Sequence, residues 1–155
     1  MKKNIYHLCF LMLLIVSTSA YSQRYRTTAD TGKLNVEYVA VSNDIAELNA
    51  KLASAQSDLP GYQAKANTAE ANAQSAAATS SVQADKATNG NVNDAKKAKR
   101  KAKKSYNEAK DAKSANHNLD NQDDKIASLT SQLNKKKQRL QELETMRADI
   151  NAKMN

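Results

Sequence analysis

The chain has 155 residues, of which 26% are charged and 5% aromatic, with three glycines, one proline and no tryptophan. So few turn-forming and aromatic residues exclude a β-sandwich, a barrel or a doubly wound sheet, and the length allows one domain at most. The composition favours long helices without a thick globular core, so we predict an all-α fold.

Residues 1 to 22 have the pattern of a bacterial secretory signal peptide. Lys2 and Lys3 precede an apolar run from residue 5 to residue 16, which is short for a membrane span. Small residues then suit cleavage after Ala20 or Ser22, and an uncleaved anchor is the alternative. The pattern predicts a periplasmic or secreted protein with no transmembrane segment in its mature form.

Export removes most of the chemistry available for catalysis. The only cysteine, Cys9, lies inside the predicted signal peptide, and His117 is the only histidine that remains after it. A disulfide, a thiolate nucleophile and a two-histidine zinc site are therefore excluded within one mature chain. Asp120, Asp123 and Asp124 lack the calcium-loop pattern, and we interpret them as acids that cap a helix start. We expect no cofactor, no metal and no enzymatic activity.

After a polar linker at residues 23 to 33, apolar residues recur at alternating steps of four and three. This spacing places them on one stripe of a helix, called the seam below, and is typical of a coiled coil. The first part of the seam comprises Leu34, Tyr38, Val41, Ile45, Leu48, Leu52, Ala55 and Leu59. A short strand over residues 34 to 41 is an alternative, because Leu34, Val36 and Tyr38 alternate.

Two breaks are expected in this pattern. Pro60-Gly61 predicts a kink or a tight joint, although the spacing continues beyond it through Tyr62, Ala66, Ala69, Ala73 and Ala76. The segment at residues 88 to 91, Thr-Asn-Gly-Asn, is the strongest turn signal in the chain.

The seam returns after the turn, first with small and then with large side chains. Its alanine-rich part is predicted at Ala95, Ala98, Ala102, Ser105, Ala109 and Ala112. After Asn116-His117-Asn118 its large residues are Leu119, Ile126, Leu129, Leu133, Leu140, Leu143, Ile150 and Met154, with Lys136 and Arg147 lying over the stripe.

A chain folded back at Gly90 pairs residues whose numbers sum to about 180, so leucines face leucines and alanines face alanines. We therefore predict a long antiparallel coiled-coil hairpin over residues 34 to 155, with a leucine-rich base and alanine-rich distal arms. Residues 60–61 and 116–121 mark a candidate hinge. Further apolar residues, Val36, Val39 and Met146, predict self-association or docking of an envelope protein at the base. The residues predicted to form that contact are Leu34, Val41, Ile45, Leu48, Leu52, Leu133, Leu140, Leu143 and Ile150.

Positive charge is concentrated in residues 96 to 113, called the basic stretch below. It holds nine basic and two acidic residues, a net charge of +7, whereas the rest of the chain beyond residue 22 sums to −1. A solvated helix face is one interpretation, and an anion-binding surface is the other. The predicted binding residues are Lys96, Lys97, Lys99, Arg100, Lys101, Lys103 and Lys104.

The predicted export argues against nucleic acid as the ligand and favours lipopolysaccharide, anionic lipid or unfolded protein. Two function classes follow: a non-enzymatic protein that binds clients or anionic envelope components through its basic arm, and a structural spacer or subunit of an envelope complex that docks through its leucine-rich base. In size, charge and helical arms the chain resembles trimeric periplasmic chaperones with long arms. Those chaperones build a β-containing body from both chain ends, and the C-terminal sequence here offers no closing strand, so the resemblance is one of architecture and we infer no family membership from it.

Overall fold

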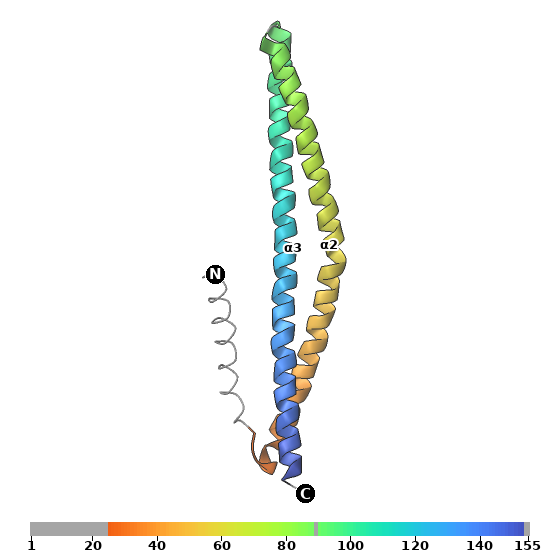
Figure 1. Ribbon diagram of the computed structural model, residues 1–155, viewed down its shortest axis with the longest axis vertical. Helices are drawn as coiled ribbons and strands as arrows, with labels where there is room; N and C mark the ends of the chain where they lie inside the picture. Colours follow the sequence, from red (N-terminus) through yellow and green to blue (C-terminus); the bar gives the residue numbers. More distant parts are fainter. Residues whose placement is uncertain (1–24, 89, 154–155) are drawn as a thin grey trace, which may run out of the picture. The chain divides into compact units, whose positions relative to one another are not determined.

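The computed structural model of the protein describes residues 25–88 and 90–153. They form a 3₁₀ turn, η2 (Thr28–Asp30), and two long helices, α2 (Thr31–Thr88) and α3 (Val92–Ala152) (Figure 1). The all-α prediction is confirmed, and because no strand occurs in the described ranges, the alternative strand at residues 34 to 41 is wrong. The predicted signal peptide and Met154 lie outside the described residues.

The chain divides into two compact units, each containing part of both helices. The base unit, as far as it is described, comprises residues 25–48 and 132–153, and the distal unit comprises residues 49–131. Within each unit the segments of α2 and α3 run antiparallel, as the sequence predicts for a helical hairpin (Figure 1).

The base unit has a core of large apolar side chains. Its fully buried members are Leu34 and Leu143, and Val41 and Met146 complete the buried cluster. Partly buried side chains packed against this cluster are Tyr25, Tyr38, Ile45 and Leu140. Met146 is 6% exposed, so the expectation that it widens an outer apolar stripe is wrong. It occupies the inward position predicted for Arg147, which is exposed.

The start of α2 is fixed by a carboxylate in the segment that the sequence predicts to be a polar linker. Asp30 accepts hydrogen bonds from the Thr27 hydroxyl at 2.8 Å and from the amides of Thr27 and Arg26 at 3.2 and 3.3 Å. The Thr27 hydroxyl, followed by the two amides, lowers the pKa of Asp30 below its ordinary value of 3.8. The helix consequently begins at Thr31, three residues before the first seam leucine.

In the distal unit, α2 continues through Pro60-Gly61 without ending. The predicted tight joint is therefore wrong, although the yellow stretch of α2, which includes this pair, is bowed (Figure 1). Every predicted α2 seam residue from Leu34 to Ala76 is buried or half-buried, so these residues lie on the less exposed face of α2. Proline removes one hydrogen bond from the helix ladder, and the packed stripe on either side holds the remaining turns together.

α3 also continues where a break is predicted, through residues 116 to 118. Asp120, Asp123 and Asp124 are exposed in the middle of this helix and cap nothing, so that interpretation is wrong. Because the helix is unbroken, the steps of four and three can be counted back from Leu119 as 115, 112, 108, 105, 101 and 98. Ala98, Ser105 and Ala112 lie on this stripe, whereas Ala95, Ala102 and Ala109 are exposed.

The segment with the strongest turn signal lies between the end of α2 at Thr88 and the start of α3 at Val92. The Asn91 side chain accepts hydrogen bonds from the amides of Asn93 at 2.9 Å and Asp94 at 3.3 Å, which caps α3. A Cβ atom on Gly90 would lie 2.6 Å from the carbonyl oxygen of Lys86. Glycine is therefore required here by the close approach of the backbone.

Candidate anion-binding surface

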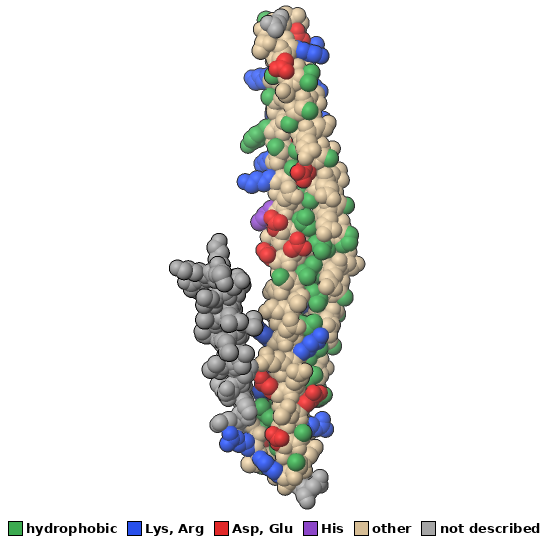
Figure 2. Space-filling model, in the orientation of Figure 1, with side chains coloured by type: hydrophobic (Ala, Val, Ile, Leu, Met, Phe, Trp, Pro, Cys, Tyr) green, Lys and Arg blue, Asp and Glu red, His purple; other side chains and the backbone are tan. Residues whose placement is uncertain are grey.

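The basic stretch lies on the first turns of α3, in the distal unit. All seven predicted binding residues are exposed: Lys96, Lys97, Lys99, Arg100, Lys101, Lys103 and Lys104. Lys97 forms an ion pair with Asp94 at 3.7 Å. In Figure 2, lysine and arginine side chains (blue) project from the α3 edge of the distal unit.

The facing part of α2 adds no net charge to this surface. Between residues 60 and 90 it carries two acids, Glu70 and Asp85, and two bases, Lys65 and Lys86. All four are exposed. The excess charge of the basic stretch is therefore not neutralised by the helix packed against it, and it creates a local field that attracts anions.

A small polar groove opens between the two helices beside the basic stretch. Asn72, Ser75 and Thr79 line it from α2, and Lys101, Lys104 and Glu108 line it from α3. Ala76, which is 8% exposed, contributes the remaining wall, and the volume is about 230 Å³. The Thr79 hydroxyl donates to the Ser75 carbonyl at 2.8 Å, which fixes its rotamer. The heptad pattern did not reveal this groove.

The residues predicted for docking at the base pack against the chain itself. Leu34, Val41, Leu133, Leu143 and Ile150 are buried. Ile45, Leu48, Leu52 and Leu140 are half-buried. The apolar side chains that the base unit presents outward are instead Val36 and Val39, which are 72% and 56% exposed.

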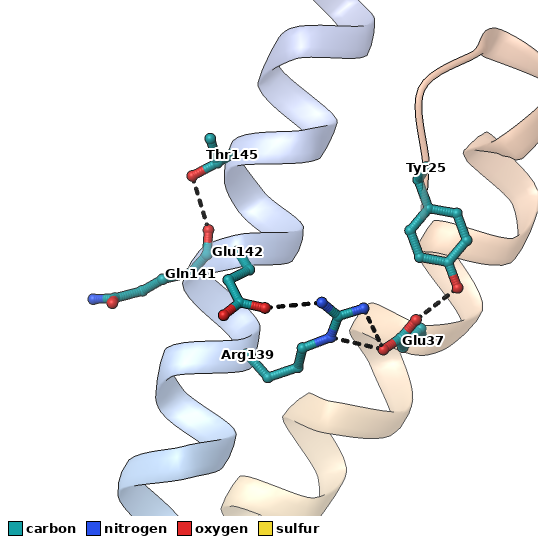
Figure 3. A network of polar contacts seen from close by, with 6 residues as sticks. All are labelled: Tyr25, Glu37, Arg139, Gln141, Glu142 and Thr145. Atoms are coloured by element: carbon teal, nitrogen blue, oxygen red, sulfur yellow. Dashed lines mark hydrogen bonds and ion pairs between the residues drawn. The ribbon is translucent and has the colours of Figure 1, made fainter. Parts of the chain in front are cut away.

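Arg139 organises a polar network on the base unit that sequence reasoning missed (Figure 3). Its guanidinium contacts Glu37 at 2.8 and 2.9 Å and Glu142 at 2.9 Å, and the Tyr25 hydroxyl donates to Glu37 at 2.6 Å. The Arg139 side chain is only 17% exposed. This burial lowers its pKa, but the hydrogen bonds to Glu142 and Glu37 outweigh it and raise the pKa overall.

Two further pairs in the base unit agree with the predicted pairing of residues whose numbers sum to about 180. Lys136 contacts Asp44 at 2.6 Å, and the Tyr38 hydroxyl donates to Glu144 at 3.4 Å. Lys136 therefore lies over the seam as predicted, with its charge paired to a carboxylate. The Arg147 guanidinium lies 5.9 Å from the centre of the Tyr38 ring.

Gln122 provides a comparable link in the distal unit. Its side-chain amide is buried and donates to the carbonyl oxygen of Ala55 at 2.6 Å. The hydrogen bond joins α3 to α2 just before the Pro60-Gly61 pair. A polar residue on the seam is a pattern break that could have identified Gln122.

Over the described ranges, no three His, Cys, Asp or Glu side chains gather closely enough to hold a metal ion. None of the described helices combines the length and apolar character needed to cross a membrane. Comparison with protein-family models, curated proteins and solved structures gave no match. The functional interpretation therefore rests on the surface chemistry of the chain.

Proposed function

We propose that this is an exported, non-enzymatic coiled-coil protein that binds anionic components of the bacterial envelope through its basic stretch. The observation that carries the proposal is the exposure of all nine bases between residues 96 and 113, facing a segment of α2 with no net charge. The signal-peptide pattern supplies the compartment, where lipopolysaccharide and acidic phospholipids present dense negative charge.

The chemistry of α3 favours binding at a surface over insertion. An interfacial membrane helix needs large apolar side chains opposite its bases. Within the basic stretch the uncharged positions are mainly alanine, and the exposed aromatic is Tyr106 alone. The attraction is consequently electrostatic, and salt should weaken it steeply.

Vesicle binding at increasing salt concentration tests this proposal. Wild-type protein should sediment with vesicles containing phosphatidylglycerol at low salt and be released as salt rises. Replacing Lys96, Lys99, Arg100 and Lys103 with glutamine should abolish binding while helicity is retained, because glutamine and these bases have similar helix propensities. Wild-type protein that ignores anionic vesicles at low salt would reduce the basic stretch to a solvated face.

An unfolded acidic polypeptide is the competing client for the same surface. A holdase that is specific for polypeptides should suppress aggregation of a denatured outer-membrane protein and should not bind anionic vesicles. Suppression that persists in the four-residue glutamine variant would contradict a role for the basic stretch in either kind of binding.

A second candidate function, a structural subunit that docks through the base, is favoured by the exposure of Val36 and Val39 on α2. A partner helix would cover these side chains and gain about 25 cal/mol per Å² of apolar surface removed from water. Val36→Asn together with Val39→Asn should release a stoichiometric partner in crosslinked pull-downs. An unchanged crosslinking pattern would exclude docking at this surface.

A further inference from the structure

The polar groove in the distal unit arises because charged residues occupy seam positions. Counting back in steps of four and three from Leu119 places Glu108 and Lys101 on the stripe that packs against α2. Glu108 is half-buried and Lys101 is exposed. Charged side chains at such positions reduce the stability of packed helices, because they cannot fill the space that an apolar residue would fill. The facing residue is Ala76, whose methyl group leaves the space open.

The resulting groove is small and is lined by polar side chains. Its volume of about 230 Å³ lies below the range of roughly 300–1,000 Å³ that is common for sites of drug-sized ligands. The wall from α2 carries the amide of Asn72 and the hydroxyls of Ser75 and Thr79, all of which can bond to polar ligand atoms. The groove therefore suits a small, highly polar group.

The charges in the groove are of both signs and are not paired with each other. Lys104 and Glu108 are four residues apart on α3, a spacing at which such residues commonly form an ion pair. In the described part of the chain, no hydrogen bond or ion pair joins Glu108 to Lys101 or Lys104, although all three line the groove. A simple anion would meet the two ammonium groups but also the Glu108 carboxylate. A ligand that carries both a phosphate and an amine satisfies all three groups.

We propose that this groove binds a zwitterionic phosphate ester, with the phosphoryl group on Lys101 and Lys104 and the ligand amine on Glu108. Asn72, Ser75 and Thr79 complete the polar contacts from α2. This assignment rests on the proposed anion-binding function and specifies which head group is selected within it. The rest of the basic stretch supplies general attraction, and the groove supplies discrimination.

Nuclear magnetic resonance titration of the full chain with O-phosphoethanolamine tests the assignment, with inorganic phosphate and ethanolamine as reference probes. Saturable shifts are expected at the amide of Ala76 and the methyl group of Thr79. Affinity should be several-fold higher for phosphoethanolamine than for inorganic phosphate. Glu108→Gln should remove this preference and leave phosphate binding intact, whereas Lys101→Gln with Lys104→Gln should weaken both ligands. Circular dichroism of each variant checks that the helices are retained.

A charge-matched control separates the groove from the surface around it. Lys96→Gln with Lys99→Gln removes the same charge without touching the groove, so this variant should keep the preference for phosphoethanolamine and bind anionic vesicles less well. Equal affinity of the wild type for phosphate and phosphoethanolamine, or an unchanged preference in Glu108→Gln, would overturn the groove assignment. Failure of the wild-type protein to bind anionic vesicles at low salt would instead overturn the proposed function.

The same signals identify the source of the head group. Vesicles of phosphatidylcholine with added phosphatidylethanolamine should broaden the Ala76 and Thr79 signals if the ligand is a lipid. Shifts with the free ester and none with these vesicles would assign a soluble ester. Either pattern supports binding of a zwitterionic phosphate ester in the groove, and the absence of a response to either probe would refute it.

Discussion

Replacing Pro60 and Gly61 with alanine should stabilise the distal unit, because both residues lie inside α2 without a packing role. Both are exposed, and a Cβ atom on Gly61 would meet no atom within 4 Å. Alanine at position 60 restores an amide donor to the carbonyl group four residues earlier. The helix penalties are about 3 kcal/mol for proline and about 1 kcal/mol for glycine. Proline also restricts the unfolded chain, and losing that restriction reduces the gain in stability by about 0.4–1 kcal/mol. The net gain for the double variant is therefore about 3 kcal/mol.

Urea unfolding followed by circular dichroism measures this gain as a shift of the midpoint at constant slope. Gly32→Ala is the matched control, since the space around that Cβ position is also open. It lies in the first turn of α2, near the end of the helix, where fraying reduces the effect of helix propensity, so its gain should be smaller. A double variant with unchanged or reduced stability would refute the reasoning and show that the bow at Pro60 is needed for packing.

Hydrogen exchange on the same variant tests the predicted hinge. The hydrogen bond from Gln122 to the Ala55 carbonyl connects the two weak segments within the distal unit. Residues 56–66 and 114–122 should exchange faster than the buried positions near Leu129, and both should slow together in the double variant. Slowing confined to residues 56–66 would mean that no shared hinge exists.

Three further changes have defined outcomes. Gly90→Ala should cost about 1–3 kcal/mol in urea unfolding, because its Cβ atom would lie 2.6 Å from the Lys86 carbonyl oxygen. Arg139→Met should cost about 1–3 kcal/mol, since it leaves two partly buried carboxylates without their shared donor, and Arg139→Lys should recover only part of that loss. Asp30 has a lowered pKa in the folded chain, so its contribution is present above pH 3.8 and disappears as pH falls through its folded pKa. The protection of amides 27–31 relative to their intrinsic exchange rates should therefore fall at acidic pH, and Asp30→Asn should remove this dependence.

The α2 seam could be predicted from the sequence because its spacing is set by large side chains. Leu34, Val41 and the residues between and after them follow one rule, and each predicted position from Leu34 to Ala76 is buried or half-buried. The predicted pairing register agrees with the contacts Glu37–Arg139 and Asp44–Lys136 in the base unit. The local breakers do not end the helices, because the penalty of about 3 kcal/mol at Pro60 falls on one turn, whereas the packing of the stripe is summed over many turns on both sides.

The α3 register was harder to predict because alanine occurs at many positions of its first half. Two sets of residues in this half share the same seven-residue spacing, namely Ala95, Ala102 and Ala109 and, three residues further along, Ala98, Ser105 and Ala112. Composition alone therefore does not show which set faces α2. The selection comes from Leu119 and the leucines beyond it, which continue through an unbroken helix. A break at residues 116–118 removes that constraint, and with it the seam positions of Lys101 and Glu108.

The energetics of the two units give the groove a physical rationale. Each buried leucine of the base unit contributes about 1.5–3 kcal/mol, whereas a buried alanine methyl contributes only about 0.8 kcal/mol. In the distal unit the positions of Lys101 and Glu108 contribute no apolar packing, so the groove lies where the contact between the helices is already weak. A ligand that bridges Lys104 and Glu108 of α3 to Thr79 of α2 would therefore supply contacts that the side chains do not supply. At a concentration one hundred times its dissociation constant, such a ligand stabilises the folded form by about 2.7 kcal/mol. That amount is comparable to one buried leucine, so occupancy of the groove would strengthen the distal unit as much as a seam residue of the base strengthens its own unit.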